Sequence, residues 1–206
     1  MRTDVIDVPG VGARQRALAV LRSGGLVAFP TDTVYGLAAD PWNEDAVRRL
    51  YQVKQRSKDL PIPLLLSDPA GISQVALLPE QCRELPGRFW PGGLTLVLSK
   101  RASVSRSISD RPTVAVRVPN LPLARDIIRG AGGVLAVTSA NISGGPSPVT
   151  AQDVEEQLGG RIALILDGGA CPVGVPSTIL DCSASPPQIL RHGGIGEEEL
   201  FAVLFP

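Results

Sequence analysis

Histidine and cysteine are scarce in this sequence of 206 residues, and their scarcity weakens the case for several common kinds of active site. Because His192 is the one histidine, a Ser-His-Asp hydrolase would have to depend on it, and a lone histidine near a chain end more often has a surface or packing role. The three cysteines, Cys82, Cys171 and Cys182, form no C-x-x-C pair. They therefore favour small buried side chains in a reducing cytosol over a zinc site.

Two nucleotide-binding patterns are also missing. The P-loop pattern of spaced glycines followed by Lys and then Ser or Thr does not occur. The glycine-rich run at 130–133 follows an expected helix and precedes an expected strand, which is the reverse of the dinucleotide-binding turn. A nucleotide site in this protein would therefore have to be built in another way.

Net charge and long apolar runs are absent as well. Lys plus Arg and Asp plus Glu each number 20, so bulk charge does not favour nucleic acid, although a local basic cleft stays open. The sequence shows no apolar N-terminal signal region and no apolar run of bilayer length. We therefore expect a cytoplasmic protein without a membrane segment.

Strand and helix patterns mix along the whole chain, without an internal repeat or a low-complexity linker. The mixture predicts one α/β domain over residues 1–206, with a twisted open mixed β-sheet and flanking helices. Helices are expected at 11–22, 43–54, 79–89, 121–129, 150–158 and 197–204. Strands are expected at 26–29, 64–66, 94–98, 114–118, 134–137 and 162–166, with a final antiparallel pair at 178–181 and 188–191.

The stretch that follows the first expected strand is the most informative part of the chain. Pro30 ends an apolar run, and Thr31, Asp32 and Thr33 follow at once. Hydroxyls and a carboxylate at the end of a buried strand are typical of a small-molecule site in an α/β sheet. The same residue types also make ordinary turns, so both interpretations stay open here.

Fixed cations and hydroxyls occur at three further places. If the second helix ends near Lys54, then Lys54 and Arg56 would aim at one region; otherwise they are a solvated helix end. Ser139 and Asn141 follow a buried strand, where they either bind a ligand or cap a turn. Arg117 lies inside a strand, where a guanidinium needs a carboxylate partner from the protein or from a ligand.

Taken together, these segments resemble the YrdC/Sua5 family, the L-threonylcarbamoyladenylate synthases, over nearly the whole chain. The residues that carry the resemblance are Pro30-Thr31-Asp32-Thr33-Val34-Tyr35-Gly36-Leu37, Lys54-x-Arg56, Val114-Ala115-Val116-Arg117-Val118-Pro119, Ser139-Ala140-Asn141-x-Ser143-Gly144, Asp167-Gly168-Gly169, Ser177-Thr178-Ile179 and Ile189-Leu190-Arg191-x-Gly193. They place the motif-bearing core at about 11–195. The chain looks like the short, single-domain form of the family.

The resemblance implies a reaction and a set of partners. L-threonine, bicarbonate and ATP would give threonylcarbamoyl-AMP and pyrophosphate, and a downstream threonylcarbamoyl transferase complex would use the product in the t6A modification of tRNA. It further implies a large, positively lined cavity and Mg²⁺ carried by the ATP phosphates, with no dedicated metal ligands and no prosthetic group. Contact with tRNA or double-stranded RNA is an additional expectation.

The resemblance also assigns roles to individual residues. The implied catalytic set is Lys54, Arg56, Ser139 and Asn141. The implied ATP-binding set is Arg56, Thr113, Ser139, Ser147 and Arg191. The implied threonine-binding set is Thr33, Arg117, the backbone of Val137 and Ser177, with Arg117 pairing the substrate carboxylate.

The sequence departs from the family pattern at four positions: Ser57, Leu121 and Pro176 replace residues that are frequent in the family, and Leu65 is near a position where some members have a histidine. No residue is an obvious general base for the threonine amine, since Asp32 fits a turn-capping role better. One alternative is an RNA-binding or ribosome-associated module without ATP turnover. Another is the carbamoyl-adenylate chemistry of the matching domain in hydrogenase-maturation proteins.

Overall fold

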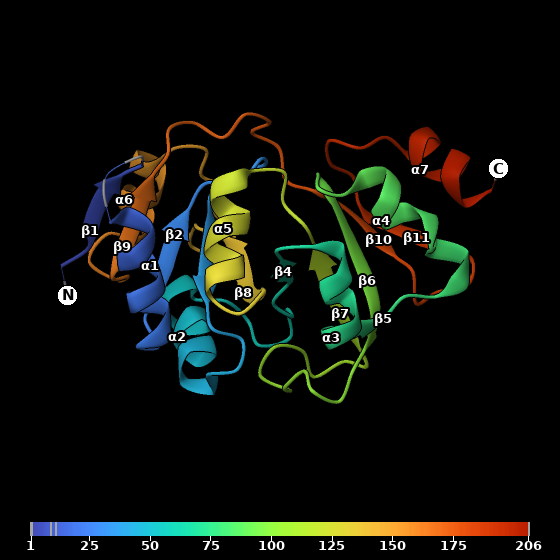
Figure 1. Cartoon of the computed structure of the whole chain (residues 1–206), viewed down its shortest axis with the longest axis horizontal. Helices are drawn as coiled ribbons and strands as arrows, with labels where there is room; N and C mark the ends of the chain where they lie inside the picture. Colours follow the sequence, from blue (N-terminus) through green and yellow to red (C-terminus); the bar gives the residue numbers. More distant parts are fainter. Residues whose placement is uncertain (1, 9, 11, 206) are drawn as a thin grey trace.

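The computed structural model describes residues 2–8, 10 and 12–205. In this part of the chain, eleven strands form one sheet in the order β1-β9-β2-β3-β8-β4-β7-β6-β10-β11, and β5 pairs with β6 (Figure 1). The strands are β1 (Asp4–Asp7), β2 (Val27–Phe29), β3 (Gly36–Ala39), β4 (Leu64–Leu66), β5 (Ala76–Leu77), β6 (Leu94–Lys100), β7 (Thr113–Arg117), β8 (Val134–Ser139), β9 (Leu164–Asp167), β10 (Thr178–Asp181) and β11 (Gln188–Arg191). The helices are α1 (Ala13–Arg22), α2 (Glu44–Lys54), α3 (Ile72–Val75), α4 (Glu84–Phe89), α5 (Pro122–Gly130), α6 (Ala151–Leu158) and α7 (Glu197–Leu204), with short 3-10 turns η1 (Pro69–Gly71) and η2 (Glu80–Cys82).

The sheet is mixed, as the sequence predicted. Strands β1 and β2 both run parallel to β9, and β4–β7 and β6–β10 are also parallel pairs. The other neighbours, including the final pair β10–β11, are antiparallel. The sheet stays open, so its two ends lie at opposite ends of the long axis of the molecule (Figure 1).

Helices cover both faces of the sheet at the end that contains β1, β9 and β2. Helices α1 and α5 bury Ala17, Leu21 and Ile127 against one face. On the other face, α2 and α6 contribute Leu50 and Val154 to the larger core. The strands between them are apolar on both sides, which is typical of sheets that helices cover twice. At the other end of the sheet, α4 and α7 lie together beside β6, β10 and β11 (Figure 1).

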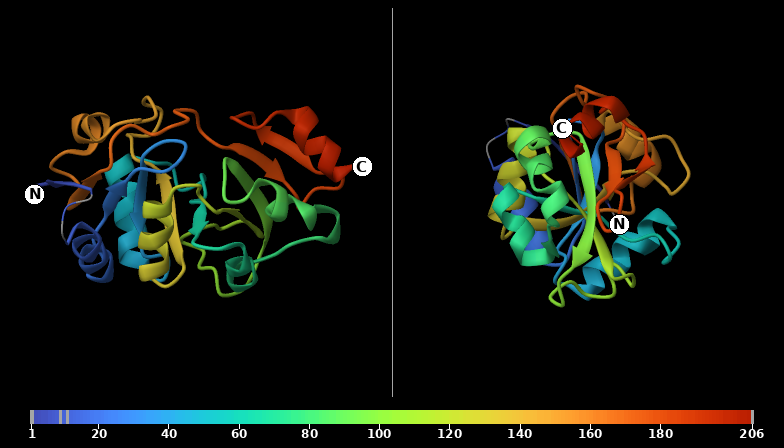
Figure 2. Two further views of the ribbon diagram at one scale, coloured as in Figure 1. Left: turned by 45° about the horizontal axis from the view of Figure 1, so that its top comes forward. Right: turned by 90° about the vertical axis from the view of Figure 1, so that its right-hand side faces the viewer.

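The connection between β9 and β10, residues 168–177, crosses from one end of the sheet towards the other (Figure 2). Its backbone is attached to the segment that follows β2, because Val173 N donates to Asp32 O at 3.0 Å and Gly174 N donates to Thr33 O at 2.9 Å. The side chain of Val173 is itself exposed. This connection therefore joins the two ends of the sheet across the segment that carries Thr33.

Helix α2 ends where the sequence predicted. The side chain of Asn43 accepts hydrogen bonds from the amides of Asp45 and Ala46, both at 3.1 Å, so it is the expected N-cap. At the other end Gln55 takes a left-handed backbone conformation with φ of 52°, which stops the helix after Lys54.

Most expected elements are confirmed, but one helix differs and several elements were not predicted. The helix expected at 79–89 is interrupted after η2, because Pro86 has no amide to donate to the carbonyl of Cys82 and its ring would clash there. Strand β3 was missed because its glycine, leucine and alanines carry little strand propensity. Strand β1 and the short elements α3 and β5 were also missed. Residue 11, where the first expected helix began, lies outside the described residues.

Two expectations about composition can be compared with the fold. All three cysteines are buried, which confirms that they act as small core side chains. No helix in the described part of the chain combines the length and the apolar composition needed to cross a bilayer.

Candidate functional site

A cleft of about 450 Å³ lies where the segments around β8 and β4 meet the strands β7, β6, β10 and β11 at the other end of the sheet. Its volume is within the range of small-molecule sites. The segment after β2, the end of β8 and the strands β4, β6, β7, β10 and β11 all contribute to its wall. Its charged lining residues are Arg56, Arg111, Arg117, Arg191 and Asp181. The cleft is therefore positively lined without a cluster of Lys or Arg in the sequence.

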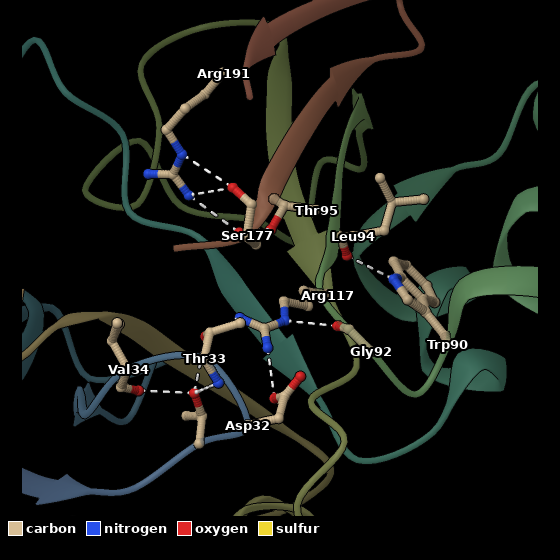
Figure 3. Close-up of polar contacts among 11 residues, drawn as sticks. Asp32, Thr33, Val34, Trp90, Gly92, Leu94, Thr95, Arg117, Ser177 and Arg191 are labelled. Atoms are coloured by element: carbon tan, nitrogen blue, oxygen red, sulfur yellow. Dashed lines mark hydrogen bonds and ion pairs between the residues drawn. The ribbon is translucent and has the colours of Figure 1, made fainter. Parts of the chain in front are cut away.

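Arg117 is held on three sides deep in the cleft (Figure 3). Its Nε donates to Gly92 O at 2.8 Å, and one terminal nitrogen donates to Thr33 Oγ1 at 2.8 Å. The other terminal nitrogen pairs with the carboxylate of Asp32, and both side chains are buried. Burial lowers the pKa of Arg117, and the Asp32 carboxylate acts in the opposite direction. Asp32 is thus the partner that a strand-embedded guanidinium requires.

The polar turn after β2 is both a turn and part of the cleft wall. Thr31 Oγ1 accepts from the amide of Thr33 at 3.2 Å, lies 3.0 Å from Thr33 Oγ1 and donates to Val34 O at 2.7 Å. Thr31 and Thr33 are each 3% exposed. Turn chemistry therefore fixes Thr33 beside Arg117, so the two interpretations of this stretch describe one structure.

Lys54 lies directly behind the cleft wall. Its Nζ donates to Ser139 O and Asn141 O, both at 2.6 Å, and to Asn141 Oδ1 at 3.2 Å. Asn141 in turn donates from Nδ2 to Gly145 O at 2.8 Å. Burial, with a smaller contribution from the charge of Arg56, lowers the pKa of Lys54 to about 7. Lys54 therefore ties the end of α2 to the loop that follows β8.

Arg56 enters the cleft itself. Its Nε donates to Leu60 O at 3.1 Å and its NH2 to Pro61 O at 3.0 Å, so backbone carbonyls fix the guanidinium at the rim. Burial lowers the pKa of Arg56. Lys54 and Arg56 differ in place: Arg56 lines the cleft, and Lys54 supports its wall through the backbone of Ser139.

A hydrogen-bonded group from β6, β11 and the residue just before β10 forms the opposite wall (Figure 3). Arg191 donates to Ser177 O from Nε at 3.0 Å and from NH2 at 2.8 Å, and NH2 also lies 3.1 Å from Ser177 Oγ. Ser177 Oγ lies 2.7 Å from Thr95 Oγ1. Burial lowers the pKa of Arg191, and the nearby Arg117 acts in the same direction.

The structure brings the residues singled out from the sequence to one place. Nine line the cleft: Thr33, Arg56, Thr113, Arg117, Val137, Ser139, Ser147, Ser177 and Arg191. The remaining two, Lys54 and Asn141, contact each other, and Lys54 also bonds the backbone of Ser139. Sequence reasoning missed Thr95 and Arg111, which also line the cleft. A polar residue between Leu94 and Leu96 in an apolar strand was the signal for Thr95.

The cleft offers cations and hydroxyls rather than a metal cage. Among the described residues, no group of three or more His, Cys, Asp or Glu side chains is placed to hold a metal ion. Fixed guanidinium groups and hydroxyls suit anionic ligands such as carboxylates and phosphates.

Comparison with known proteins gives relatives for both the sequence and the fold. A family model for Sua5/YciO/YrdC, described as telomere recombination, matches residues 19–193. The chain is 46% identical over 197 residues to threonylcarbamoyl-AMP synthase of Bacillus subtilis, covering 93% of this chain and 56% of that protein. It is 34% identical over 184 residues to threonylcarbamoyl-AMP synthase of Vibrio campbellii, covering 87% and 98%.

Among solved structures, Sua5 of Pyrococcus abyssi complexed with L-threonine matches with a TM-score of 0.94 and 41% identity. The match covers 98% of this chain and 61% of that one. The chain thus spans a little over half of the relatives from Bacillus subtilis and Pyrococcus abyssi, and nearly all of the relative from Vibrio campbellii.

Proposed function

Because the chain belongs to the Sua5/YciO/YrdC family, we propose that its cleft is the active site of a threonylcarbamoyl-AMP synthase. The proposed reaction condenses L-threonine, bicarbonate and ATP to threonylcarbamoyl-AMP and pyrophosphate. The observation that carries the proposal is the cleft itself, where a buried guanidinium with hydroxyl neighbours faces a second group of cations and hydroxyls. Relatives named for this activity, and one solved in complex with L-threonine, support it.

The amino acid would occupy the deep part of the cleft. A guanidinium has five N–H donors, and three of those on Arg117 are engaged by Gly92, Thr33 and Asp32. Its remaining donors are available for the substrate carboxylate. Thr33, Ser177 and the backbone of Val137 would complete the amino-acid site, as the family resemblance implies.

The nucleotide would lie towards Arg56 and Arg191, with Thr113, Ser139 and Ser147 as further contacts. In the chemical step a carbamate oxygen of N-carboxythreonine forms a bond to the α-phosphorus, and the bond from that phosphorus to pyrophosphate breaks. Negative charge grows on the leaving pyrophosphate, and fixed guanidinium groups that need no rearrangement are well suited to stabilise it. Mg²⁺ would enter on the phosphates and neutralise part of their charge.

Lys54 and Asn141 would act from behind the wall. The three oxygen acceptors around Lys54 Nζ fix the backbone at Ser139, which lines the proposed nucleotide site. Lys54 would therefore position Ser139 and add positive potential. It need not contact the phosphates directly.

The test is threonine-dependent release of pyrophosphate. Purified protein is mixed with ATP, Mg²⁺ and bicarbonate, and pyrophosphate is measured with and without L-threonine. The proposal expects release only when threonine is present, with formation of threonylcarbamoyl-AMP in equal amount. Release that ignores threonine, or no release, would reject it.

The later use of the product belongs to the same proposal. Threonylcarbamoyl-AMP would be passed to a threonylcarbamoyl transferase complex for the t6A modification of tRNA. The alternative of an RNA-binding module without ATP turnover has less support, because the net charge is zero and the relatives are named for the synthase activity.

A further inference from the structure

Thr95 lies in the cleft, and the family resemblance gives it no role. It is on β6 and is 4% exposed, although its neighbours Leu94 and Leu96 point into the apolar core. The antiparallel register pairs Leu96 with Val116, so Thr95 and Arg117 are the next residues along β6 and β7, and both line the cleft. A hydroxyl is thus placed beside the cation that would hold the substrate carboxylate.

Thr95 is fixed through Ser177. Their hydroxyl oxygens are 2.7 Å apart, and Ser177 Oγ also accepts a hydrogen bond from Arg191 NH2 at 3.1 Å (Figure 3). Arg191 further binds the backbone oxygen of Ser177 through two donors. Because a guanidinium can only donate, Ser177 Oγ must be the acceptor in its hydrogen bond with Arg191.

Counting protons shows what the pair presents to a ligand. Thr95 and Ser177 have two hydroxyl protons, and the bond between them uses one. Within the described residues, the other proton has no acceptor. The pair is therefore a net donor of one hydrogen bond, beside the two N–H groups of Arg117 for which the described part of the chain provides no acceptor. Such a set of donors is complementary to an anionic oxygen.

We propose that Thr95 is a positioning residue for the amino-acid substrate, which orients the Ser177 hydroxyl so that the pair donates to the substrate carboxylate beside Arg117. The inference rests on the proposed function, since it assigns this part of the cleft to the carboxylate of threonine. The alternative is that the Thr95 hydroxyl has a purely structural role. In that case its hydrogen bond with Ser177 satisfies it, and it has no effect on substrate affinity.

The test compares Thr95→Val, Thr95→Ala and Thr95→Ser with the parent protein. Valine has the shape of threonine without the hydroxyl, alanine replaces it if the valine variant does not fold, and serine restores the hydroxyl. Steady-state pyrophosphate release gives KM for threonine, KM for ATP and kcat, and calorimetry gives threonine affinity directly. T95V leaves Ser177 its own proton to donate but removes the hydrogen bond that fixes the direction of that hydroxyl. Loss of one neutral hydrogen bond predicts a threonine KM about fivefold higher for T95V, with KM for ATP and kcat changed less than about twofold. T95S should stay within about twofold of the parent.

Thr178→Val is the matched control. Thr178 is equally buried and follows Ser177 directly, but its hydroxyl bonds both the oxygen and the amide of Ile195, outside the cleft. We expect T178V to lower the melting temperature and to leave the threonine KM unchanged. An unchanged threonine KM in T95V, an equal rise in T178V, or no rescue by T95S would overturn the inference while leaving the synthase proposal intact. A parent protein without threonine-dependent release would overturn both.

Discussion

At the scale of single residues, the geometry of Arg117 matters more than its charge. Three protein acceptors hold the guanidinium in one plane before any ligand is bound, and the compensating carboxylate of Asp32 removes the cost of an unpaired buried charge. Lysine would keep the charge but lose the fixed fork of donors. The substitution therefore separates charge from geometry.

Replacing Arg117 by Lys should raise the threonine KM by at least about tenfold, because an ammonium cannot hold Gly92, Thr33, Asp32 and a carboxylate together. The KM for ATP should change much less. Steady-state kinetics with each substrate varied in turn provides the measurement. Arg129→Lys, at an exposed pair with Asp126, is the control. Equal KM values in R117K and the parent would show that the amino acid binds elsewhere.

Lys54 makes stability depend on pH in a defined direction. Its pKa is about 7 in the folded protein, against an ordinary value of 10.5. Between these values the unfolded chain binds more protons, so the contribution of Lys54 to the free energy of unfolding rises with pH. Below pH 7 both states are protonated and this contribution is at its lowest.

Lys54→Met removes that contribution and leaves the oxygens of Ser139 and Asn141 without their donor, at a cost of roughly 1–3 kcal/mol. Urea unfolding of the parent and of K54M at several pH values from 6 to 9 measures the difference in free energy. We expect the difference to be constant below about pH 7 and to grow in favour of the parent above it. A difference that does not vary with pH would contradict this account.

At the scale of elements, the contact between the start of β10 and the end of β11 sets the position of Ser177. Gly193 lies so close to this segment that an added Cβ would be 2.3 Å from the amide nitrogen of Thr178 and 2.4 Å from Pro176 O. Backbone atoms cannot move aside as a flexible side chain can. The glycine two residues after Arg191 is therefore a requirement of how these strands approach each other.

Gly193→Ala should lower the melting temperature and raise the threonine KM together, since β11 would have to move and take Arg191 away from Ser177. Gly196→Ala is the matched control, because an added Cβ there has no neighbour within 4 Å and the backbone φ is -73°. Thermal unfolding and steady-state kinetics on both variants give the comparison. If G193A behaves like G196A, then the close approach does not control the site.

At the scale of the whole molecule, the cleft is assembled from segments that are distant in sequence. Arg117 and Asp32 are 85 positions apart, and Lys54 and Ser139 are also 85 apart. Substrates that contact residues from both ends of the sheet should stabilise the entire fold. For one site, a ligand at 100 times its Kd contributes about 2.7 kcal/mol to the free energy of unfolding.

We therefore expect threonine with a non-hydrolysable ATP analogue to raise the urea midpoint of the parent protein. R117K should need a higher threonine concentration for the same shift, because its affinity for the amino acid is lower. Glycine, which lacks the side chain of threonine, is a suitable comparison ligand. A midpoint that is insensitive to both substrates would argue against a site that spans the sheet.

The sequence predicted local features better than contacts. The N-cap at Asn43 and the end of α2 at Lys54 follow from local chemistry, and both are confirmed. The pairing of Arg117 with Asp32 could not be derived, because nothing local tells which carboxylate meets a buried guanidinium. The placement of Lys54 behind the wall was likewise inaccessible, since it depends on where the loop after β8 turns. Family resemblance singled out nine of the residues that line the cleft, but their hydrogen bonds came from the fold.

The connection between β9 and β10, residues 168–177, suggests a way to engineer the protein. A cut beside the exposed Val173 would separate a C-terminal peptide that carries Ser177 and Arg191 from the rest of the chain. This peptide would be held mainly by the pairing of β10 with β6, from Thr178 opposite Leu94 to Asp181 opposite Val97. The two fragments would then form a complementation pair, whose reassembly should become stronger when the bound small molecules bridge them.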